Sequence, residues 1–368
     1  MKVPFVSFDY QNQIIREELI NKITNVFDSG YYVLGSNIVT FEKKYSKVNG
    51  VKYSIGVGSG LDALTIALKA LNVGIGDEVI VASNAYIASW LSISSVGAKI
   101  IPVEPNSDTF NIDPNLIEEK INSKTKVIMP VHLYGQPCEM DKIMELSRRY
   151  NLFVVEDNAQ SHLAKYNSSY TGSFGDINAT SFYPTKNLGA IGEAGCITTN
   201  NKELRDYVKA YRNYGSIKKY INIIKGSNSR IDEIQAAILN VKIKYLREWN
   251  EQRKMLASKY DYLLKDISEI STPVVKTKAE HVYHLYVIKT NERDKLKEFL
   301  NKNGVGTSIH YPTPPHLQKA YKELGYKKGD FPIAEKLAKT SLSLPLYPGL
   351  EEGQIEFICE KISKFFSR

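Results

Sequence analysis

The sequence predicts an α/β protein with two domains: a large domain in which a mostly parallel sheet lies between helices, and a smaller α+β domain at the C-terminal end. From about residue 50 to residue 240, short apolar segments of strand length alternate with segments of helical periodicity, which is typical of a sheet covered on both faces. A length of 368 residues with 43% hydrophobic residues is enough for a large core and favours two domains over one. We place the domains at 1–248 and 249–368.

The elements of the large domain follow from these two periodicities. Apolar segments of strand length predict four central strands, at Glu78–Ala82, Lys99–Val103, Lys126–Val131 and Leu152–Glu156. Apolar residues that recur every three or four positions predict helices at Leu61–Leu71 and Met140–Tyr150. Parallel neighbours need crossover connections, and we expect these to be right-handed.

A longer helical pattern leads into the second domain. It begins after Arg230 and continues with few breakers toward Leu263, so we expect one long helix that joins the domains. Beyond it, the same criteria predict strands at Tyr283–Lys289 and Thr307–Tyr311 and helices at Arg293–Asn303 and Gly353–Phe366. The mixture of strands and helices makes the second domain α+β.

The charge pattern argues against a nucleic-acid partner. The formal charge is +8, but 48 basic residues are interspersed with 40 acidic ones, and no basic stripe with interleaved aromatic residues occurs. A modest positive field suits an anionic small molecule equally well.

Cysteine spacing and hydropathy exclude several other classes. The three cysteines, Cys138, Cys196 and Cys359, match no zinc or redox spacing, so we expect no metal and a reducing compartment. No segment reaches the roughly 20 apolar residues of a membrane span, and the first residues have no long apolar core. The expectation is a cytoplasmic protein that does not enter a membrane.

A lysine in a short polar segment is the strongest chemical signal in the chain. Lys186 lies between Pro184 and Gly189, and a lysine enclosed in a pocket can lose its proton and attack a carbonyl group. Upstream, Asp157 closes a predicted strand, and open α/β sheets bind ligands at the carboxyl ends of their strands. An amine nucleophile with a carboxylate partner for a pyridine nitrogen indicates pyridoxal phosphate (PLP) chemistry. Gln160 follows about one helical turn later.

Together these features resemble the sugar-nucleotide aminotransferases of the DegT/DnrJ/StrS family, and the resemblance covers nearly the whole chain. Six ordered blocks carry it: Asp28–Gly35, Gly56–Leu64, Glu156–Gln160, Ser181–Ala190, Gly226–Ala237 and Ser343–Pro348. It implies the aspartate aminotransferase-like fold, PLP-dependent transferase fold type I. PLP would be the cofactor, with pyridoxamine phosphate as its half-reaction form.

The resemblance also assigns roles to the residues around the cofactor. Lys186 is expected to form the Schiff base with PLP and then to carry the proton between the substrate carbon and the cofactor. Asp157 would keep the pyridine nitrogen protonated, and Gln160 would hydrogen-bond the 3-hydroxyl. Tyr86 matches the position whose ring stacks on the cofactor face; a buried core tyrosine is the alternative.

The phosphate of the cofactor has a predicted cradle at the start of a helix. Ser59, Gly60 and Leu61 open the helix that runs to Leu71, and helix N-terminal amides bind phosphate. Ser181 would add a hydroxyl group. Asn228 is expected to reach the same phosphate from a neighbouring subunit, which implies an obligate homodimer with its sites at the interface.

Within the family, the chain resembles the branch that acts on 3-keto sugars. The Ser59–Leu64 and Asn228–Glu233 segments carry this likeness. The implied reaction transfers the amino group of L-glutamate to C3 of a dTDP-linked 3-keto-6-deoxyhexose, giving a dTDP-3-amino-3,6-dideoxyhexose for a surface glycan such as lipopolysaccharide O-antigen. The candidate sugar-contacting residues are Tyr32, Tyr183, Lys219, His310 and Tyr311.

Two other functions remain open at this point. One is an aminotransferase for a 4-keto or UDP-linked sugar, including a 3-keto uronic acid. The other is a non-catalytic PLP-binding regulator, which would hold the cofactor but not react with glutamate. The presence of Lys186, Asp157 and Gln160 favours an enzyme.

Overall fold

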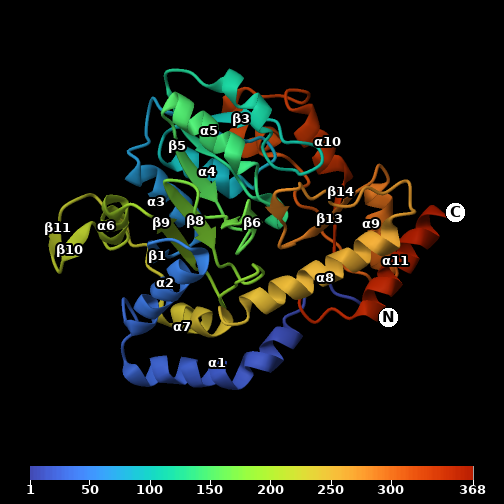
Figure 1. Ribbon diagram of the computed structural model, residues 1–368, viewed down its shortest axis with the longest axis horizontal. Coiled ribbons are helices and arrows are strands. Elements are labelled where there is room, and N and C mark those ends of the chain that lie inside the picture. The colour runs from blue at the N-terminus through green and yellow to red at the C-terminus, as the bar shows by residue number, and fades with distance from the viewer. Residues whose placement is uncertain (368) are drawn as a thin grey trace.

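A seven-stranded sheet forms the centre of the large domain in a computed structural model that describes residues 1–367 (Figure 1). Its strands lie in the order β1-β9-β8-β5-β4-β2-β3. Their bounds are β1 Tyr53–Val57, β2 Glu78–Ala82, β3 Lys99–Val103, β4 Thr125–Met129, β5 Phe153–Asp157, β8 Ile177–Ser181 and β9 Gly195–Thr199. Strands β8, β5, β4, β2 and β3 are parallel, whereas β9 runs antiparallel to both of its neighbours. The predicted mostly parallel sheet is confirmed.

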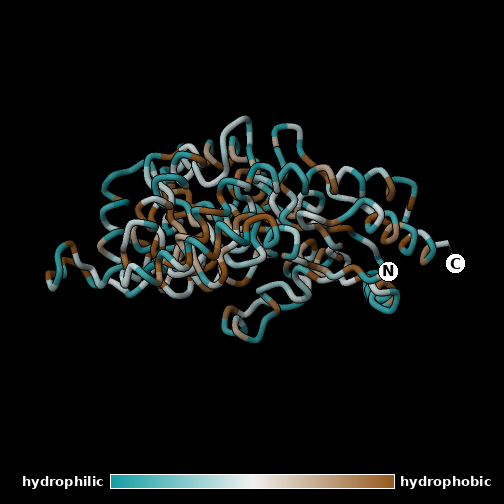
Figure 2. Tube along the Cα trace, turned by 90° about the horizontal axis from the view of Figure 1, so that it is seen from below, coloured by the Kyte–Doolittle hydropathy of each residue, from teal (hydrophilic) through white to brown (hydrophobic). Residues whose placement is uncertain are grey.

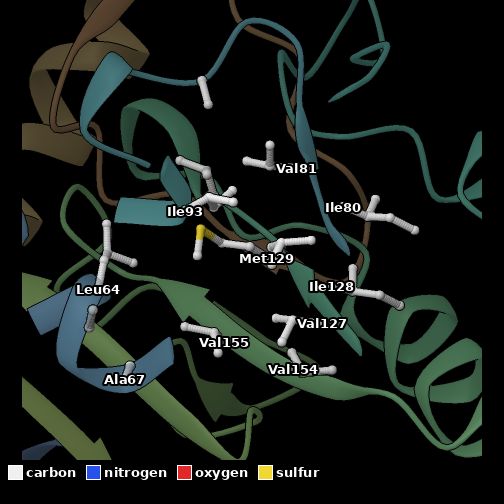
Figure 3. Close-up of a cluster of buried hydrophobic side chains, with 14 of the residues drawn as sticks. Leu64, Ala67, Ile80, Val81, Ile93, Val127, Ile128, Met129, Val154 and Val155 are labelled. Atoms are coloured by element: carbon white, nitrogen blue, oxygen red, sulfur yellow. The ribbon is translucent and has the colours of Figure 1, made fainter. Parts of the chain in front are cut away.

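The sheet is buried because its strands are apolar on both faces, as a sheet between two helical layers requires. Figure 3 shows the packing at the middle of this core, where β2, β4 and β5 meet side chains from α3 (Gly60–Ala70) and α4 (Ile87–Ser95). Each fully buried aliphatic side chain of this kind contributes about 1.5–3 kcal/mol. The labelled members are Leu64, Ala67, Ile80, Val81, Ile93, Val127, Ile128, Met129, Val154 and Val155.

The remaining helices of the large domain are α1 Asp9–Ser29, α2 Ser36–Asn49, α5 Met140–Tyr150, α6 Lys202–Tyr211 and α7 Glu233–Lys242. They cover the sheet and its edge, except α1, which packs on α7. Helix α7 packs on both α1 and α2 below β1 (Figure 1). A short hairpin, β10 (Ser216–Lys218) and β11 (Ile221–Asn222), projects from the body at one end in both views (Figures 1 and 2). A small three-stranded sheet joins β6 (Lys165–Tyr166), β7 (Ser169–Tyr170) and β12 (Ala279–Glu280).

The single long helix expected after Arg230 is wrong, because the chain forms two helices. Helix α7 ends at Lys242, and α8 runs over Leu246–Leu264 after a turn. The two helices bury side chains in different places: Ala236 and Leu239 pack beside the large sheet, whereas Leu256 and Tyr260 pack in a separate cluster with the C-terminal elements. The intervening turn redirects the chain from one cluster to the other.

The C-terminal part has its own hydrophobic cluster. Helices α8, α9 (Arg293–Lys302) and α11 (Glu352–Phe366) pack around an antiparallel pair of strands, β13 (Tyr286–Lys289) and β14 (Ser341–Leu344). Residue Val3 from the start of the chain joins this cluster and bridges Val305. The domain boundary at 248/249 stays a prediction.

The predicted strand at Thr307–Tyr311 is wrong in most of its length. Only Ser308 forms a bridge, with Ser343. His310 and Tyr311 instead contact the large domain: the Tyr134 hydroxyl donates to the His310 carbonyl, and the Gln160 amide donates to the Tyr311 hydroxyl at 3.1 Å. These contacts across the two parts of the chain take the place of a further strand pair.

The segment that follows Tyr311 lies against the large sheet. It contains helix α10 (Pro332–Thr340), and the amides of Ile333 and Ala334 in the first turn donate to the Glu104 carboxylate at 2.6 and 3.1 Å. An acid at a helix N-terminus satisfies free amides and the helix dipole. Tyr321 packs edge-on against Trp90 of α4, with 5.2 Å between ring centroids. Within residues 1–367, the helices are all too short or too polar to cross a membrane.

Candidate active site

A cavity of about 460 Å³ lies where the carboxyl ends of the parallel strands meet the C-terminal part of the chain. Strands β5 and β8 supply Asp157 and Ser181, the loop after β8 supplies Lys186, and the C-terminal part supplies His284, His310 and Tyr311. The predicted residues that line it are Ser59, Gly60, Leu61, Tyr86, Asp157, Gln160, Ser181, Tyr183, Lys186, His310 and Tyr311.

Lys186 is held in a tight turn between β8 and β9. Its amide donates to the Tyr183 carbonyl at 2.9 Å. The turn requires Gly189, since a Cβ there would lie 2.2 Å from the Pro184 carbonyl oxygen, and Lys242 donates to the Gly189 carbonyl at 2.9 Å. Burial lowers the pKa of Lys186 to about 8, and the negative charge of Asp157 opposes that shift. A substantial fraction of this amine is therefore neutral near pH 8.

Asp157 ends β5 with both carboxylate oxygens engaged. The Ser89 hydroxyl of α4 donates to Oδ2 at 2.7 Å, and the Ala159 amide donates to Oδ1 at 3.1 Å. Burial raises the pKa of Asp157, while Ser89 and then the Ala159 amide oppose the shift. Because both donors prefer the carboxylate, they stabilise the ionised form in a buried place.

Gln160 and Tyr311 form a second polar group in the wall. The Gln160 side-chain oxygen accepts from the Tyr134 amide at 2.7 Å, so its nitrogen must face the Tyr311 hydroxyl, 3.1 Å away. The ring of Tyr86 lies 4.8 Å from the ring of Tyr311 and is about half exposed. Tyr86 is therefore a cavity residue and not a buried core tyrosine. Gln160 is buried rather than on a helix surface.

The start of α3 offers free amides to the cavity. Ser59 caps the helix by accepting from the Asp62 amide at 3.1 Å, and within residues 1–367 nothing accepts from the amides of Gly60 and Leu61. A Cβ at Gly60 would lie 2.6 Å from the Cβ of Ser181. The close approach brings the Ser181 hydroxyl to the helix N-terminus, which makes a site for a phosphate group.

Three predicted residues do not line the cavity of their own chain. Lys219 lies in the turn of the β10–β11 hairpin with its ammonium group 5.1 Å from the Tyr220 ring. Tyr32 is exposed, and its hydroxyl donates to the Phe27 carbonyl at 3.1 Å. Asn228 is exposed and bridges Asn213.

Other cavity residues were missed at the sequence level. They are Thr185 and His284 in the lining and Ser89 behind Asp157. Thr185 adjoins Lys186 and could have been included on that ground. Ser89 and His284 had no local signal, because their partners are distant in sequence.

The functional groups that line the cavity match the groups that PLP needs from a protein. A flat pyridine ring with a phosphate arm needs a buried anion for its nitrogen, an amine for its aldehyde and free amides for its phosphate. Asp157, Lys186 and the start of α3 supply these three groups around one cavity. The part of the chain that the structure describes holds no cluster of three or more His, Cys, Asp or Glu residues suited to a metal ion.

Fold and site together define a fold type I transferase, and comparison with known proteins gives the family. The profile of the DegT/DnrJ/EryC1/StrS aminotransferase family matches residues 13–363, and the chain belongs to that family. It is 46% identical over 365 residues to a dTDP-3-amino-3,6-dideoxy-alpha-D-galactopyranose transaminase of Aneurinibacillus thermoaerophilus, with 99% of each chain covered.

Solved structures agree with this relationship. The crystal structure of S. venezuelae DesV in complex with a ketimine intermediate superposes with a TM-score of 0.98 at 41% identity, covering 100% of this chain and 99% of that one. NtdA from Bacillus subtilis with bound cofactor PMP gives a TM-score of 0.92 at 34% identity, covering 100% of this chain and 86% of that one.

Proposed function

We propose that the protein is a PLP-dependent aminotransferase that moves an amino group from L-glutamate to C3 of a dTDP-3-keto-6-deoxyhexose, giving a dTDP-3-amino-3,6-dideoxyhexose. The main support for the proposal is that Lys186 and Asp157 line the same cavity, in a chain that belongs to this aminotransferase family. The likeness to a dTDP-3-amino sugar transaminase supports the choice of nucleotide and of C3.

PLP supplies an aldehyde that carries the amino group and a ring that absorbs the electron pair released at the substrate carbon. The start of α3, with Ser59, Gly60 and Leu61, would hold its phosphate together with Ser181. Asp157 would pair with the pyridine nitrogen. Gln160 would hydrogen-bond the 3-hydroxyl, and the exposed ring of Tyr86 would cover one face.

Lys186 has two tasks in this scheme. As a neutral amine, the form that its lowered pKa favours, it would attack the aldehyde of the cofactor and hold the cofactor between turnovers. When released by the substrate amine, the Lys186 amine would take the proton from the substrate carbon and return it on the same face of the site. The Ser89 hydroxyl and the Ala159 amide donate to the two oxygens of Asp157 and favour the ionised form that would pair with the pyridine nitrogen.

The sugar nucleotide would lie on the open side of the cavity. Tyr183, His310 and Tyr311 line the cavity and would contact the hexose. Burial and the nearby charge of Lys186 lower the pKa of His310 to about 4, so it meets the substrate as a neutral ring. Tyr32 and Lys219 lie outside the cavity of their own chain, and we place them against the nucleotide in a partner's site.

A homodimer would complete the site. The segment Tyr31–Leu34 and the β10–β11 hairpin expose large apolar side chains; Tyr220 is 87% exposed and Tyr31 is 63% exposed. Exposed large apolar side chains in such numbers are typical of protein interfaces. Asn228 follows the hairpin, and in a dimer it would reach the phosphate of the neighbouring subunit's cofactor.

The product would be a precursor of a surface glycan such as lipopolysaccharide O-antigen. Nucleotide sugars and glutamate are made and used in the cytoplasm, so we place the reaction there.

The decisive test compares keto sugars that differ in the position of the ketone. The protein is converted with glutamate to its pyridoxamine form and then mixed with a 3-keto or a 4-keto dTDP-6-deoxyhexose while the visible absorbance is recorded. Return of the pyridoxal band with the 3-keto sugar alone is the expected result. The same measurement is repeated with a UDP-linked keto sugar. Return of the band only with the 4-keto or the UDP-linked sugar would keep the mechanism and replace the substrate, and a band that glutamate cannot convert would indicate a PLP-binding regulator.

Substitution of the lysine tests the chemistry directly. Lys186→Ala removes the nucleophile and the proton carrier, so turnover should fall below detection while the fold persists and PLP binds without a covalent link. Turnover, circular dichroism and retention of PLP on gel filtration measure these outcomes. The exposed Lys202→Ala is the matched control and should behave as wild type. Measurable turnover in Lys186→Ala would contradict the assignment.

A further inference from the structure

His284 is a cavity residue whose ring contacts the side chain of Asn187, and Asn187 is held by Asn250 of α8. Its Nδ1 lies 3.3 Å from the side-chain oxygen of Asn187, the residue that follows Lys186. Asn187 in turn contacts the side-chain oxygen of Asn250 and the carbonyl of Val282. All three polar side chains in this group are buried.

The orientation of the Asn187 amide is fixed by its neighbours. Its nitrogen lies 3.0 Å from the Val282 carbonyl oxygen, which can only accept a hydrogen bond. It lies 2.8 Å from the Asn250 side-chain oxygen, and Asn250 is itself oriented because its nitrogen donates to the His162 carbonyl at 2.9 Å. The Asn187 oxygen must therefore be the atom that faces His284.

That orientation fixes the tautomer of His284. An amide oxygen accepts but cannot donate, so the hydrogen of the neutral ring must sit on Nδ1. The ring is neutral because burial, and after it the charges of Lys186 and Arg253, lower its pKa well below the ordinary value. Nε2 is then left with a lone pair, and it makes no hydrogen bond to any residue within 1–367.

We infer that Nε2 of His284 accepts a hydrogen bond from a hydroxyl group of the keto hexose, on a carbon next to the one that receives the amino group. His284 lines the same cavity as Lys186, which must reach the reacting carbon. A bare lone pair repels carboxylate and phosphate oxygens and accepts only from donors. The hexose offers hydroxyl donors there, whereas the only donor of glutamate is the reacting amine, so His284 is a specificity residue for the sugar half-reaction.

The inference rests on the proposed function, and two substitutions test it. In His284→Asn, the shorter amide can keep the contact with Asn187 but has no atom at the place of Nε2. In His284→Gln, the longer side chain can return an oxygen to that place. Binding is measured by calorimetry on the pyridoxamine form of the intact enzyme, with the dTDP-3-amino-3,6-dideoxyhexose product and, separately, with dTDP, which lacks the hexose.

His284→Asn should weaken binding of the amino sugar nucleotide about tenfold, as expected for one lost hydrogen bond, and leave dTDP unchanged within about twofold. His284→Gln should recover part of the loss. In single turnovers, the sugar half-reaction should slow in His284→Asn while the glutamate half-reaction does not. Equal losses for dTDP and the amino sugar, or for both half-reactions, would assign His284 a structural role and overturn the inference.

Two further outcomes keep the proposal separate from the function on which it rests. If the wild-type enzyme binds no dTDP-amino sugar, the proposed substrate fails. If it binds the sugar and His284→Asn binds it equally well, only the role of His284 fails. Should His284→Asn not fold, long-range proton–nitrogen NMR of the wild-type protein, with its six histidines, gives the tautomer directly. A hydrogen on Nε2 would overturn the inference.

Discussion

At the scale of single residues, the site depends on two buried groups whose charges are stabilised differently. Within residues 1–367 the amine of Lys186 has no hydrogen-bond partner, and burial takes away part of its basicity. Asp157 is less exposed than Lys186 but receives hydrogen bonds from Ser89 and Ala159, which oppose the cost of its charge. The result is an amine that can act as a nucleophile beside a carboxyl group whose ionised form receives two hydrogen bonds.

The basicity of Lys186 can be tested through cofactor capture. The neutral amine is the nucleophile, so the rate at which cofactor-free protein captures PLP should rise with pH and level off above about 8. Below that pH the ammonium form predominates and the rate falls about tenfold per pH unit. The growth of the visible absorbance band over a pH series measures this rate. A rate that still rises toward pH 10 would show an ordinary lysine.

Ser89 should affect PLP binding through its hydrogen bond to Asp157. Removing its hydroxyl in Ser89→Ala takes away a charge-assisted hydrogen bond, so the pKa of Asp157 rises further and PLP affinity falls about tenfold or more. Because the carboxylate is needed in its ionised form, the loss of affinity on acidification should begin at a higher pH than in wild type. Fluorescence titration of cofactor-free protein with PLP measures both effects.

The control for this substitution lies one turn further along α4. Ser92→Ala removes a hydroxyl that is also buried but donates to the Ser89 carbonyl at 2.7 Å instead of to Asp157. Its PLP affinity and the pH dependence of that affinity should match wild type. Equal effects of the two substitutions would mean that Ser89 acts through packing of α4.

Sequence reasoning found the groups that carry the chemistry but not those that orient them. Lys186 and Asp157 stand at a polar segment and at the end of an apolar strand, which are local signals. Ser89 acts on a residue 68 positions away, and His284 acts with Asn187 across 97 positions. Serine and histidine are common in ordinary structure, so only the folded arrangement distinguishes these two.

At the scale of elements, the strands were predictable because they are buried on both faces and therefore apolar throughout. The strands Glu78–Ala82 and Lys99–Val103 were predicted with the bounds that the structure has. The break between α7 and α8 was not, since Ile243–Tyr245 contains no glycine or proline to mark a turn. Its cause is tertiary: the two helices pack into separate hydrophobic clusters.

Helix α2 depends on an acid from another helix. Its N-cap residue Gly35 has no side chain to cap it, and the buried Glu233 of α7 accepts instead from the amides of Gly35, Asn37 and Ile38. A carboxylate at a helix N-terminus satisfies free amides and the dipole together. This contact also fixes the exposed Tyr31–Leu34 segment that precedes α2.

Glu233→Ala should lower the free energy of unfolding by about 3 kcal/mol, because it leaves several buried amides without an acceptor. Glu233→Gln keeps one oxygen and should lose less. Urea unfolding at fixed protein concentration measures the change. Glu248→Ala, in the exposed first turn of α8, serves as the control and should stay within about 0.5 kcal/mol of wild type. A loss below about 1 kcal/mol in Glu233→Ala would contradict the capping role.

At the scale of the whole molecule, the cavity is assembled from both parts of the chain, yet it holds few cationic groups. Lys186 is the one lysine in its lining, and no arginine within residues 1–367 lines it. The substrates proposed for it carry a diphosphate and two carboxylates, which favour positive partners. Lys219 and Asn228 lie on or beside the projecting hairpin, outside their own cavity, where a second subunit would bring them to the site.

A mixing experiment tests whether Asn228 acts across subunits. Asn228→Asp places a carboxylate where the phosphate would bind, and the like charges should weaken PLP retention. In a heterodimer of Lys186→Ala with Asn228→Asp, a cross-subunit arrangement joins the intact Lys186 of one chain to the intact Asn228 of the other. One site is then wild type and the other carries both changes.

Random reassociation of equal amounts of the two variants makes about half of the dimers mixed, so about a quarter of all sites should be fully active. Turnover at limiting PLP, after the variants have been unfolded and refolded together, measures this recovery, and each variant refolded alone sets the background. If Asn228 instead served the cavity of its own chain, every site in the mixture would carry one of the two defects. Activity would then equal the average of the two separate variants, because no pairing of chains could bring an intact Lys186 and an intact Asn228 to the same cofactor.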